Sequence, residues 1–254
     1  MLKKSWLLTA AAIAAAALAL IPGALGQVVR SGNLIVEIEG HISPTKLPKK
    51  KPAPISLTLE GSLKTADGSH PPVIKSLFLE FDKHGHLDTT GLASCRVGQL
   101  ENTLTSQAKK ACGSALVGSG KVSAQIAFPE QAPFTASGPL LIFNGSSGAK
   151  QMLIFHVYAH VPAPTTFVTT AKIGKAHGRY GTSASVTVPT IVSGQGSLTS
   201  FKATLHKSWN AKGKKKSLLL ASCPSGHLYA HGDFLFANGD KLEGEVTRSC
   251  TPSG

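Results

Sequence analysis

Apolar and polar residues alternate in short runs along almost the whole of this chain, and this alternation constrains the fold more than any other feature. It is clear in segments 34–39 (LIVEIE), 55–60 (ISLTLE) and 77–82 (LFLEFD). A period of two places every second side chain on one face of a strand, so each run predicts a β-strand with one buried face. Similar runs recur at 122–128, 139–143, 152–161, 166–173, 184–188, 198–206, 216–222, 227–237 and 241–248.

Turn-forming residues separate these runs. They occur as ADG at 66–68, HGH at 84–86, NGSSG at 144–148, SGQG at 193–196 and NGD at 238–240. Asn238 and Gly239 lie between two alternating runs, which predicts a hairpin closed by a type I′ turn. About a dozen short strands joined in this way predict an all-β fold, an antiparallel β-sandwich of the jelly-roll or Greek-key kind.

One segment departs from the strand pattern. Residues 99–111 place Leu100, Leu104, Ala108 and Ala111 at helical spacing and end in a basic turn. Cations near the last turn of a helix interact favourably with its dipole. The segment therefore predicts one short helix, over about 99–111, packed on a sheet.

Residues 1–26 have the features of a secretory signal peptide. Lys3 and Lys4 form a basic start, no charge follows until Arg30, and small residues precede a cleavage point after Gly26. The alternative is an uncleaved anchor, because the uncharged stretch is long enough to span a bilayer. The break at Pro22-Gly23 favours cleavage. We therefore expect a secreted, extracellular protein, associated with the cell envelope and without stable membrane insertion after cleavage.

The remaining residues, 27–254, are numerous enough for one large domain with a real core. We expect a single β-sandwich domain. The alternative is two small sandwiches that divide near 130–137.

Four cysteines follow the signal segment: Cys95, Cys112, Cys223 and Cys250. An even number in an exported chain predicts two disulfides, for which three pairings are possible. The pairs Cys95–Cys112 and Cys223–Cys250 are favoured because each closes a local loop. The alternative, a zinc site, needs paired ligands at tight spacing, and no C-x-x-C motif is present.

The chain is strongly basic, with 26 Lys and Arg against 13 Asp and Glu. Loss of Lys3 and Lys4 with the signal lowers the net charge from +13 to +11. Two exposed loops are expected to carry much of this charge, through Lys49, Lys50, Lys51, Lys212, Lys214, Lys215 and Lys216. Such a surface attracts anionic partners, here a cell-wall polymer or glycan, although the alternative is a merely solvated surface. Nucleic acid is not expected, because no aromatic residues are interleaved for base stacking.

The segment 155–164 (FHVYAHVPAP) contains two histidines that could suggest a metal site. On a strand that rises about 3.3 Å per residue, His156 and His160 stand about 13 Å apart. Two ligands of one metal cannot be so distant. We therefore expect a partly exposed strand face, shared by Met152, Ile154, His156, Tyr158 and His160, opposite a face shared by Leu153, Phe155, Val157, Ala159 and Val161.

A second polar cluster is a weak metal-site candidate. Segment 81–88 (FDKHGHLD) holds Asp82, His84, His86 and Asp88, ligand types that suit zinc, copper or nickel. A turn containing glycine also collects polar residues for no chemical reason. Segment 227–233 (HLYAHGD) is a weaker candidate of the same kind. No cofactor is predicted.

No G-x-S-x-G motif is present, and no segment indicates a nucleophile or a phosphate loop. The expected function is a non-enzymatic interaction or structural protein of the cell envelope. One alternative is a metal-assisted extracellular hydrolase that uses His84 and His86. Another is a carbohydrate-binding module, for which Trp209 offers an aromatic contact unless it folds back onto the sandwich.

The runs DTTGLASC (88–95), AKKACGSALVGSG (108–120), LLIFNG (140–145), YGTSASVTVP (180–189) and KKSLLLASCPSG (215–226) complete the sequence features. Together they resemble a group of uncharacterised exported proteins of high-G+C Gram-positive bacteria, over most of residues 33–250. The shared motifs are cysteines, glycine turns and the end of a helix. The resemblance implies the same disulfide pairing and an all-β fold, and it implies no activity.

Overall fold

The computed structural model describes residues 27–254, and the predicted signal segment 1–26 lies outside the described residues. Twelve strands form one antiparallel sheet. In spatial order they are β1 (Gln27–Ser31), β2 (Leu34–Ser43), β5 (Ser56–Thr65), β13 (Gly196–Leu205), β8 (Leu116–Ile126), β9 (Phe134–Asn144), β10 (Met152–Ala159), β11 (Thr165–Lys175), β12 (Tyr180–Thr187), β6 (Ile74–Asp82), β17 (His227–Phe236) and β18 (Lys241–Ser249). The predicted all-β, antiparallel fold is confirmed, and the sheet continues through the hairpin at 130–137.

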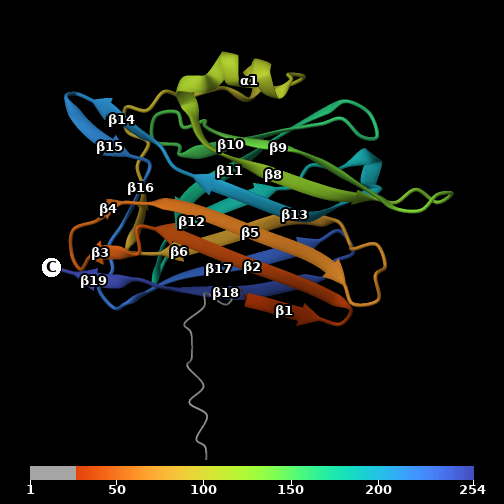
Figure 1. Ribbon diagram of the computed structural model, residues 1–254, viewed down its shortest axis with the longest axis horizontal. Coiled ribbons are helices and arrows are strands. Elements are labelled where there is room, and N and C mark those ends of the chain that lie inside the picture. The colour runs from red at the N-terminus through yellow and green to blue at the C-terminus, as the bar shows by residue number, and fades with distance from the viewer. Residues whose placement is uncertain (1–26) are drawn as a thin grey trace, which may run out of the picture.

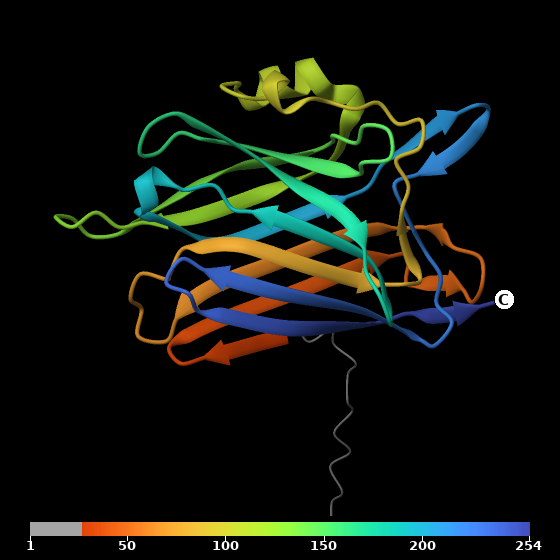
Figure 2. The same cartoon turned by 180° about the vertical axis from the view of Figure 1, so that it is seen from behind.

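The sheet curves back on itself into a sandwich with a barrel-like closure. Figures 1 and 2 show β8, β9 and β10 in one layer and β1, β2, β17 and β18 in the other. The two edges of the sheet meet, because β18 contacts both β1 and β2. A side chain at Gly244 of β18 would lie 2.8 Å from Val29 of β1, so glycine permits this close approach. The inward faces of the strands therefore surround a common interior.

The connections are of the Greek-key kind. Strands β8 to β12 follow one another as a meander, and β13 then returns to pair with β8. A strand that returns beside the first member of a meander defines a Greek key. This connection joins the two layers.

Three small sheets cover one end of the large one. They pair β4 (Ala53–Pro54) and β7 (Gly85–Leu87) with β16 (Leu219–Ala221), β14 (Ser208–Ala211) with β15 (Lys214–Ser217), and β3 (Lys46–Pro48) with β19 (Thr251–Ser253). The disulfide Cys223–Cys250 lies at this end, in the favoured pairing. It packs with Leu47 and Leu228 in a buried cluster.

Helix α1 (Thr105–Cys112) covers the outer face of β9 and β10 (Figure 1). Its buried Ala108 packs with Leu141 and Ile154 of these strands, and the disulfide Cys95–Cys112 ties the helix to the preceding loop. Short 3₁₀ turns occupy η1 (Val97–Gln99), η2 (Gly113–Ala115) and η3 (Val192–Gly194).

The helix begins six residues later than the start predicted at residue 99. Asn102 adopts a positive φ of 56°, which a helix does not accommodate. The Thr103 hydroxyl also donates to the Leu100 carbonyl, closing a local turn instead of a helical one. Leu104 is consequently 43% exposed rather than buried on the helix face.

The hairpin between β17 and β18 is confirmed, but its predicted turn type is wrong. Of the two central residues, only Gly239 has a positive φ, whereas a type I′ turn needs both. The Gly239 N–H donates to the Phe236 carbonyl, and the Phe236 N–H donates to the Asp240 carbonyl. The loop is therefore longer, with one left-handed glycine.

Among residues 27–254, no helix is both long and apolar enough to cross a membrane.

Candidate ligand-binding site

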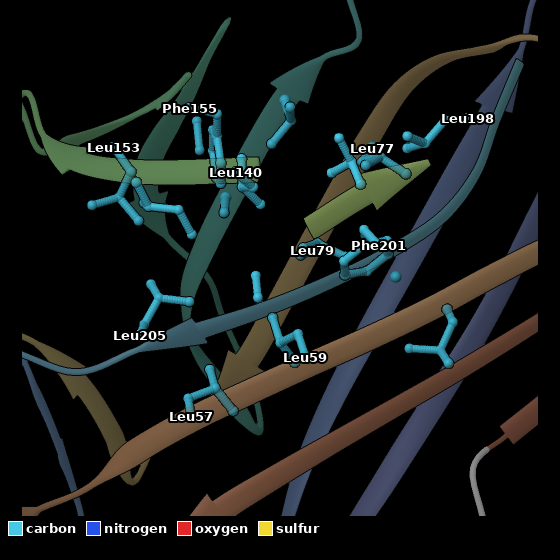
Figure 3. A pocket seen from close by; sticks show the side chains of 18 of the residues that line it. Leu57, Leu59, Leu77, Leu79, Leu140, Leu153, Phe155, Leu198, Phe201 and Leu205 are labelled. Carbon is cyan, nitrogen blue, oxygen red and sulfur yellow. The ribbon is translucent and has the colours of Figure 1, made fainter. Parts of the chain in front are cut away.

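The interior of the sheet holds a cavity of about 410 Å³. Its wall is built from the inward face of nearly every long strand, because each strand sends alternate side chains to the same side. In Figure 3 the labelled side chains converge on a common space from β5, β6, β9, β10 and β13. They are Leu57, Leu59, Leu77, Leu79, Leu140, Leu153, Phe155, Leu198, Phe201 and Leu205.

Strand β10 shows how the sequence creates this wall. Leu153, Phe155 and Val157 line the cavity, as do Ala159 and the following Val161. These are the five residues that period-two alternation places on one face, so the predicted division of the two faces is confirmed. The opposite face packs against the loop before α1.

A buried cluster lies at each end of the cavity. Leu228 and Cys223 belong to the cluster beside the small sheets, at the start of β17. Phe236 and Leu242 belong to the opposite cluster, where β17 ends and β18 begins. Val161 lies at this second end, lines the cavity and is 49% exposed. The connection between β10 and β11 is therefore the best candidate for an opening.

The cavity wall carries few charges. Asp82, which is 6% exposed, accepts hydrogen bonds from the backbone N–H of His84 (2.9 Å) and of Tyr229 (3.3 Å). It also accepts one from Nδ1 of His84 at 2.7 Å. The carboxylate on the wall is therefore already supplied with donors.

Among the wall residues in the described part of the chain, Arg248 is the one arginine, and there is no lysine. It follows Leu242, Gly244 and Val246 at every second position of β18, so it belongs to the inward face. Its Nε and Nη2 atoms are closed off from solvent and have no hydrogen-bond partner among residues 27–254. No carboxylate of those residues forms an ion pair with it.

Arg248 belongs to none of the motifs that pointed to candidate sites, although the sequence contains a signal for it. An arginine at the inward position of an alternating strand is unusual, because arginine is rarely buried without a partner. The cavity itself leaves no such signal in the chain.

His156 and His160 do not form a joint site. His156 is fully buried on the outer face of β10, with Nε2 3.0 Å from the Thr103 carbonyl oxygen. Burial lowers the pKa of His156, and the hydrogen bond to Thr103 opposes this only in part. His160 is exposed and lies edge-on against the Tyr158 ring. The strand face that was expected to be partly exposed is therefore buried at His156 and exposed at His160.

The weak metal candidates are divided between separate partners. Asp82 and His84 bond to each other, whereas Asp88 accepts from Lys216 Nζ at 2.9 Å. Burial raises the pKa of Asp88, but its hydrogen bonds from Lys216 and Thr90 outweigh burial and hold the pKa below its usual value. His86 is exposed and lies on β7. The four residues do not form one ligand cluster.

Within residues 27–254, the one cluster with suitable metal-ligand spacing joins His231, Asp233 and Glu243, whose ligand atoms lie within 4.8 Å of one another. Asp233 pairs in register with Glu243 across β17 and β18, on the outward face. Carboxylates of neighbouring strands often face water in this way, so the cluster alone does not define a metal site.

The lysine-rich loops lie at the end of the molecule that carries the small sheets, in both views (Figures 1 and 2). Lys216 is half-buried in its ion pair with Asp88. The other members are exposed: Lys49, Lys50, Lys51, Lys212, Lys214 and Lys215. The second stretch is not the expected loop, because Lys214 and Lys215 lie on β15, which pairs with β14. We call these six residues the lysine loops.

Trp209 does not extend into solvent as a platform for sugars. It is half-buried, packs against the cluster that contains Leu205 and Leu218, and donates its indole N–H to the Thr90 carbonyl at 3.2 Å. It folds back onto the sheet.

Fold and site together define the class of protein: an antiparallel β-sandwich that closes around an apolar cavity. No family model, curated protein or solved structure matches the chain.

Proposed function

We propose that this chain is a secreted, non-enzymatic binding protein that holds an apolar or amphipathic molecule, such as one with an alkyl chain, inside the sheet. The observation that carries the proposal is the apolar cavity of about 410 Å³. Ligand pockets of proteins typically measure about 300–1,000 Å³ and are lined mainly by hydrophobic side chains.

The size of the cavity supports a ligand over a packing defect. Protein interiors are close-packed and contain few voids larger than a water molecule. Unfilled apolar space in a core lowers stability, because the side chains around it lose packing partners. An apolar ligand would recover much of this stability by displacing weakly held water or filling empty space.

The experiment is a titration of the purified chain with Nile red, a neutral dye that fluoresces in apolar surroundings. We expect saturable binding of about one dye per chain, because the interior of the sheet holds one cavity of about 410 Å³. Ala184→Phe should weaken binding about tenfold or more, since Ala184 lines the cavity and the ring removes apolar volume. Ser185→Phe is the matched control, because Ser185 is the exposed neighbour on the same strand.

Ala203→Phe fills the cavity from another strand, β13. This second variant tests whether weaker binding comes from lost cavity volume or from a local effect of Ala184→Phe. Circular dichroism would establish that each variant is folded. Absence of saturable binding by the unaltered chain would overturn the proposal. So would undiminished binding in both folded variants.

We propose a second interaction, because the lysine loops present six exposed cations at one end of the molecule. None of the six forms an ion pair with a carboxylate of residues 27–254. Salt-sensitive contact with an anionic cell-wall polymer or glycan would use this surface.

Retention on immobilised heparin tests this interaction. Lys212→Gln combined with Lys215→Gln should lower the salt concentration of elution. Lys109→Gln combined with Lys110→Gln removes the same charge from α1 and should change elution less. Equal shifts in the salt concentration of elution for the two pairs would show that retention depends on net charge alone, which would contradict a contact through the lysine loops.

A further inference from the structure

Arg248 is partly exposed as a residue, but it lines the cavity, its Nε and Nη2 atoms are closed off from solvent, and it has no counter-charge among residues 27–254. It is one of four arginines in residues 27–254. Arg30 and Arg96 are exposed, and Arg179 forms an ion pair with Glu245 on the outside of the sheet. Arg248 alone of the four lines the cavity. Placing a cation against an apolar wall is costly unless something pairs with it.

The unpartnered atoms of Arg248 are Nε and Nη2, which form one edge of the guanidinium group. The N–H groups on this edge donate in parallel, and they match the two oxygens of a carboxylate or phosphate. The one carboxylate among the described wall residues, Asp82, is satisfied by His84 and by the Tyr229 N–H. This edge is closed off from solvent in the structure, so an anion that enters with a ligand would reach it only after the arginine side chain turns about its own torsions.

The register fixes where such an anion would lie. Arg248 pairs with Leu228 at the start of β17, beside the cluster that contains the Cys223–Cys250 disulfide. Val161 and the β10–β11 connection lie at the opposite end of the strands. The described wall is apolar apart from scattered hydroxyl groups and the side chains of Asp82, His86, His231 and Arg248.

We propose that Arg248 binds the anionic headgroup of an amphipathic ligand whose apolar chain fills the cavity and extends toward the β10–β11 connection. The inference rests on the proposed function, because it requires that the cavity takes up a ligand. It adds the chemical class of that ligand: an alkyl chain that ends in a carboxylate or a phosphate. It also adds the orientation, with the headgroup at the Cys223–Cys250 end.

The test displaces Nile red from the full folded chain with three compounds of equal chain length: dodecanol, dodecanoate and dodecyl phosphate. A hydrogen-bonded charge pair should make at least one anion bind about 10- to 100-fold more tightly than the alcohol. The preferred anion tells carboxylate from phosphate.

Three variants then locate the effect. Arg248→Met should abolish the preference for the anion and leave dodecanol affinity unchanged. Arg248→Lys keeps the charge without the parallel donors, so it should retain part of the preference. Arg30→Met, which removes an exposed arginine, should behave as the unaltered chain does.

The outcomes separate this inference from the proposed function. If Nile red and dodecanol bind but neither anion binds more tightly than dodecanol, the inference fails and the proposed function stands. An anion preference that survives both Arg248 substitutions also overturns the inference. If neither the dye nor any of the three compounds binds, both proposals fall together.

Discussion

Nε2 of His156, on β10, lies 3.0 Å from the carbonyl oxygen of Thr103, in the loop that precedes α1. The two residues are 53 positions apart in the chain, and their contact seals the outer face of the strand beneath that loop. The other ring nitrogen, Nδ1, is buried and has no partner among residues 27–254. The imidazole is therefore best accommodated in its neutral form, with Nε2–H donating to Thr103.

This burial predicts a pH-dependent stability. The pKa of His156 is lowered in the folded chain by desolvation, so the unfolded chain takes up the proton more readily. The free energy of unfolding should be fully retained above the unfolded pKa of about 6.5 and fall as the pH drops below it, toward the lower folded pKa. Urea unfolding at about pH 7.5 and about pH 5.5 would measure this loss.

His156→Leu should reduce that loss, whereas His160→Leu, at an exposed position, should not. Each variant removes one imidazole from the same chain, so the comparison isolates residue 156. An unchanged pH dependence in His156→Leu would contradict the prediction.

The disulfides should contribute comparable stability, because the loops that they close differ little in length. Their sequence separations are 17 and 27 residues. Loop-closure entropy then gives about 3 kcal/mol for Cys95–Cys112 and about 3.5 kcal/mol for Cys223–Cys250. Urea unfolding of each double Cys→Ala variant would test these values. A loss well below 1 kcal/mol in either variant would contradict the prediction and would indicate residual structure in the unfolded chain that lacks the bridge.

Gly120 should tolerate no side chain. An added Cβ would overlap the Lys202 carbonyl of the neighbouring strand β13, where only backbone movement could relieve it. Gly120→Ala should therefore lower the free energy of unfolding by about 1–3 kcal/mol or more. Gly98→Ala is the control, because a methyl group at that position would have no neighbour within 4 Å and the φ of Gly98 is not positive. That variant should unfold within about 1 kcal/mol of the unaltered chain.

Filling the cavity should stabilise the fold, whether a ligand or a side chain fills it. Nile red at about 100 times its dissociation constant should raise the free energy of unfolding by about 2.7 kcal/mol. Without dye, Ala184→Phe should unfold at a higher urea concentration than Ser185→Phe, because the ring enters empty space. In the presence of dye, the difference between the urea midpoints of the two variants should become smaller or change sign. Identical urea midpoints under all four conditions would contradict this prediction.

Period-two alternation predicted most of the strands and their two faces, since side-chain direction on a strand depends only on position. It assigned Leu153 and Phe155 to one face and His156 to the other, and the structure agrees. The disulfide pairing followed from local loop closure. Those features depend on interactions that are local or repeat regularly.

The cavity could not be predicted in this way, because alternation says which side chains face inward but not how far apart the facing layers stand. The start of α1 was also missed, since helical spacing includes Leu100 although Asn102 interrupts the helix. The turn at Asn238 and Gly239 depended on backbone angles that the residue types allow but do not require.

Each long strand of this sheet carries two independent constraints in alternate residues. In β10, Phe155 lines the cavity, whereas its neighbours Ile154 and His156 pack against the loop and helix outside. A change in the size or shape of the cavity therefore requires substitutions at every second position only, and the intervening residues keep the scaffold together. The selectivity of the interior and the integrity of the exterior can change separately within the same short stretch of chain.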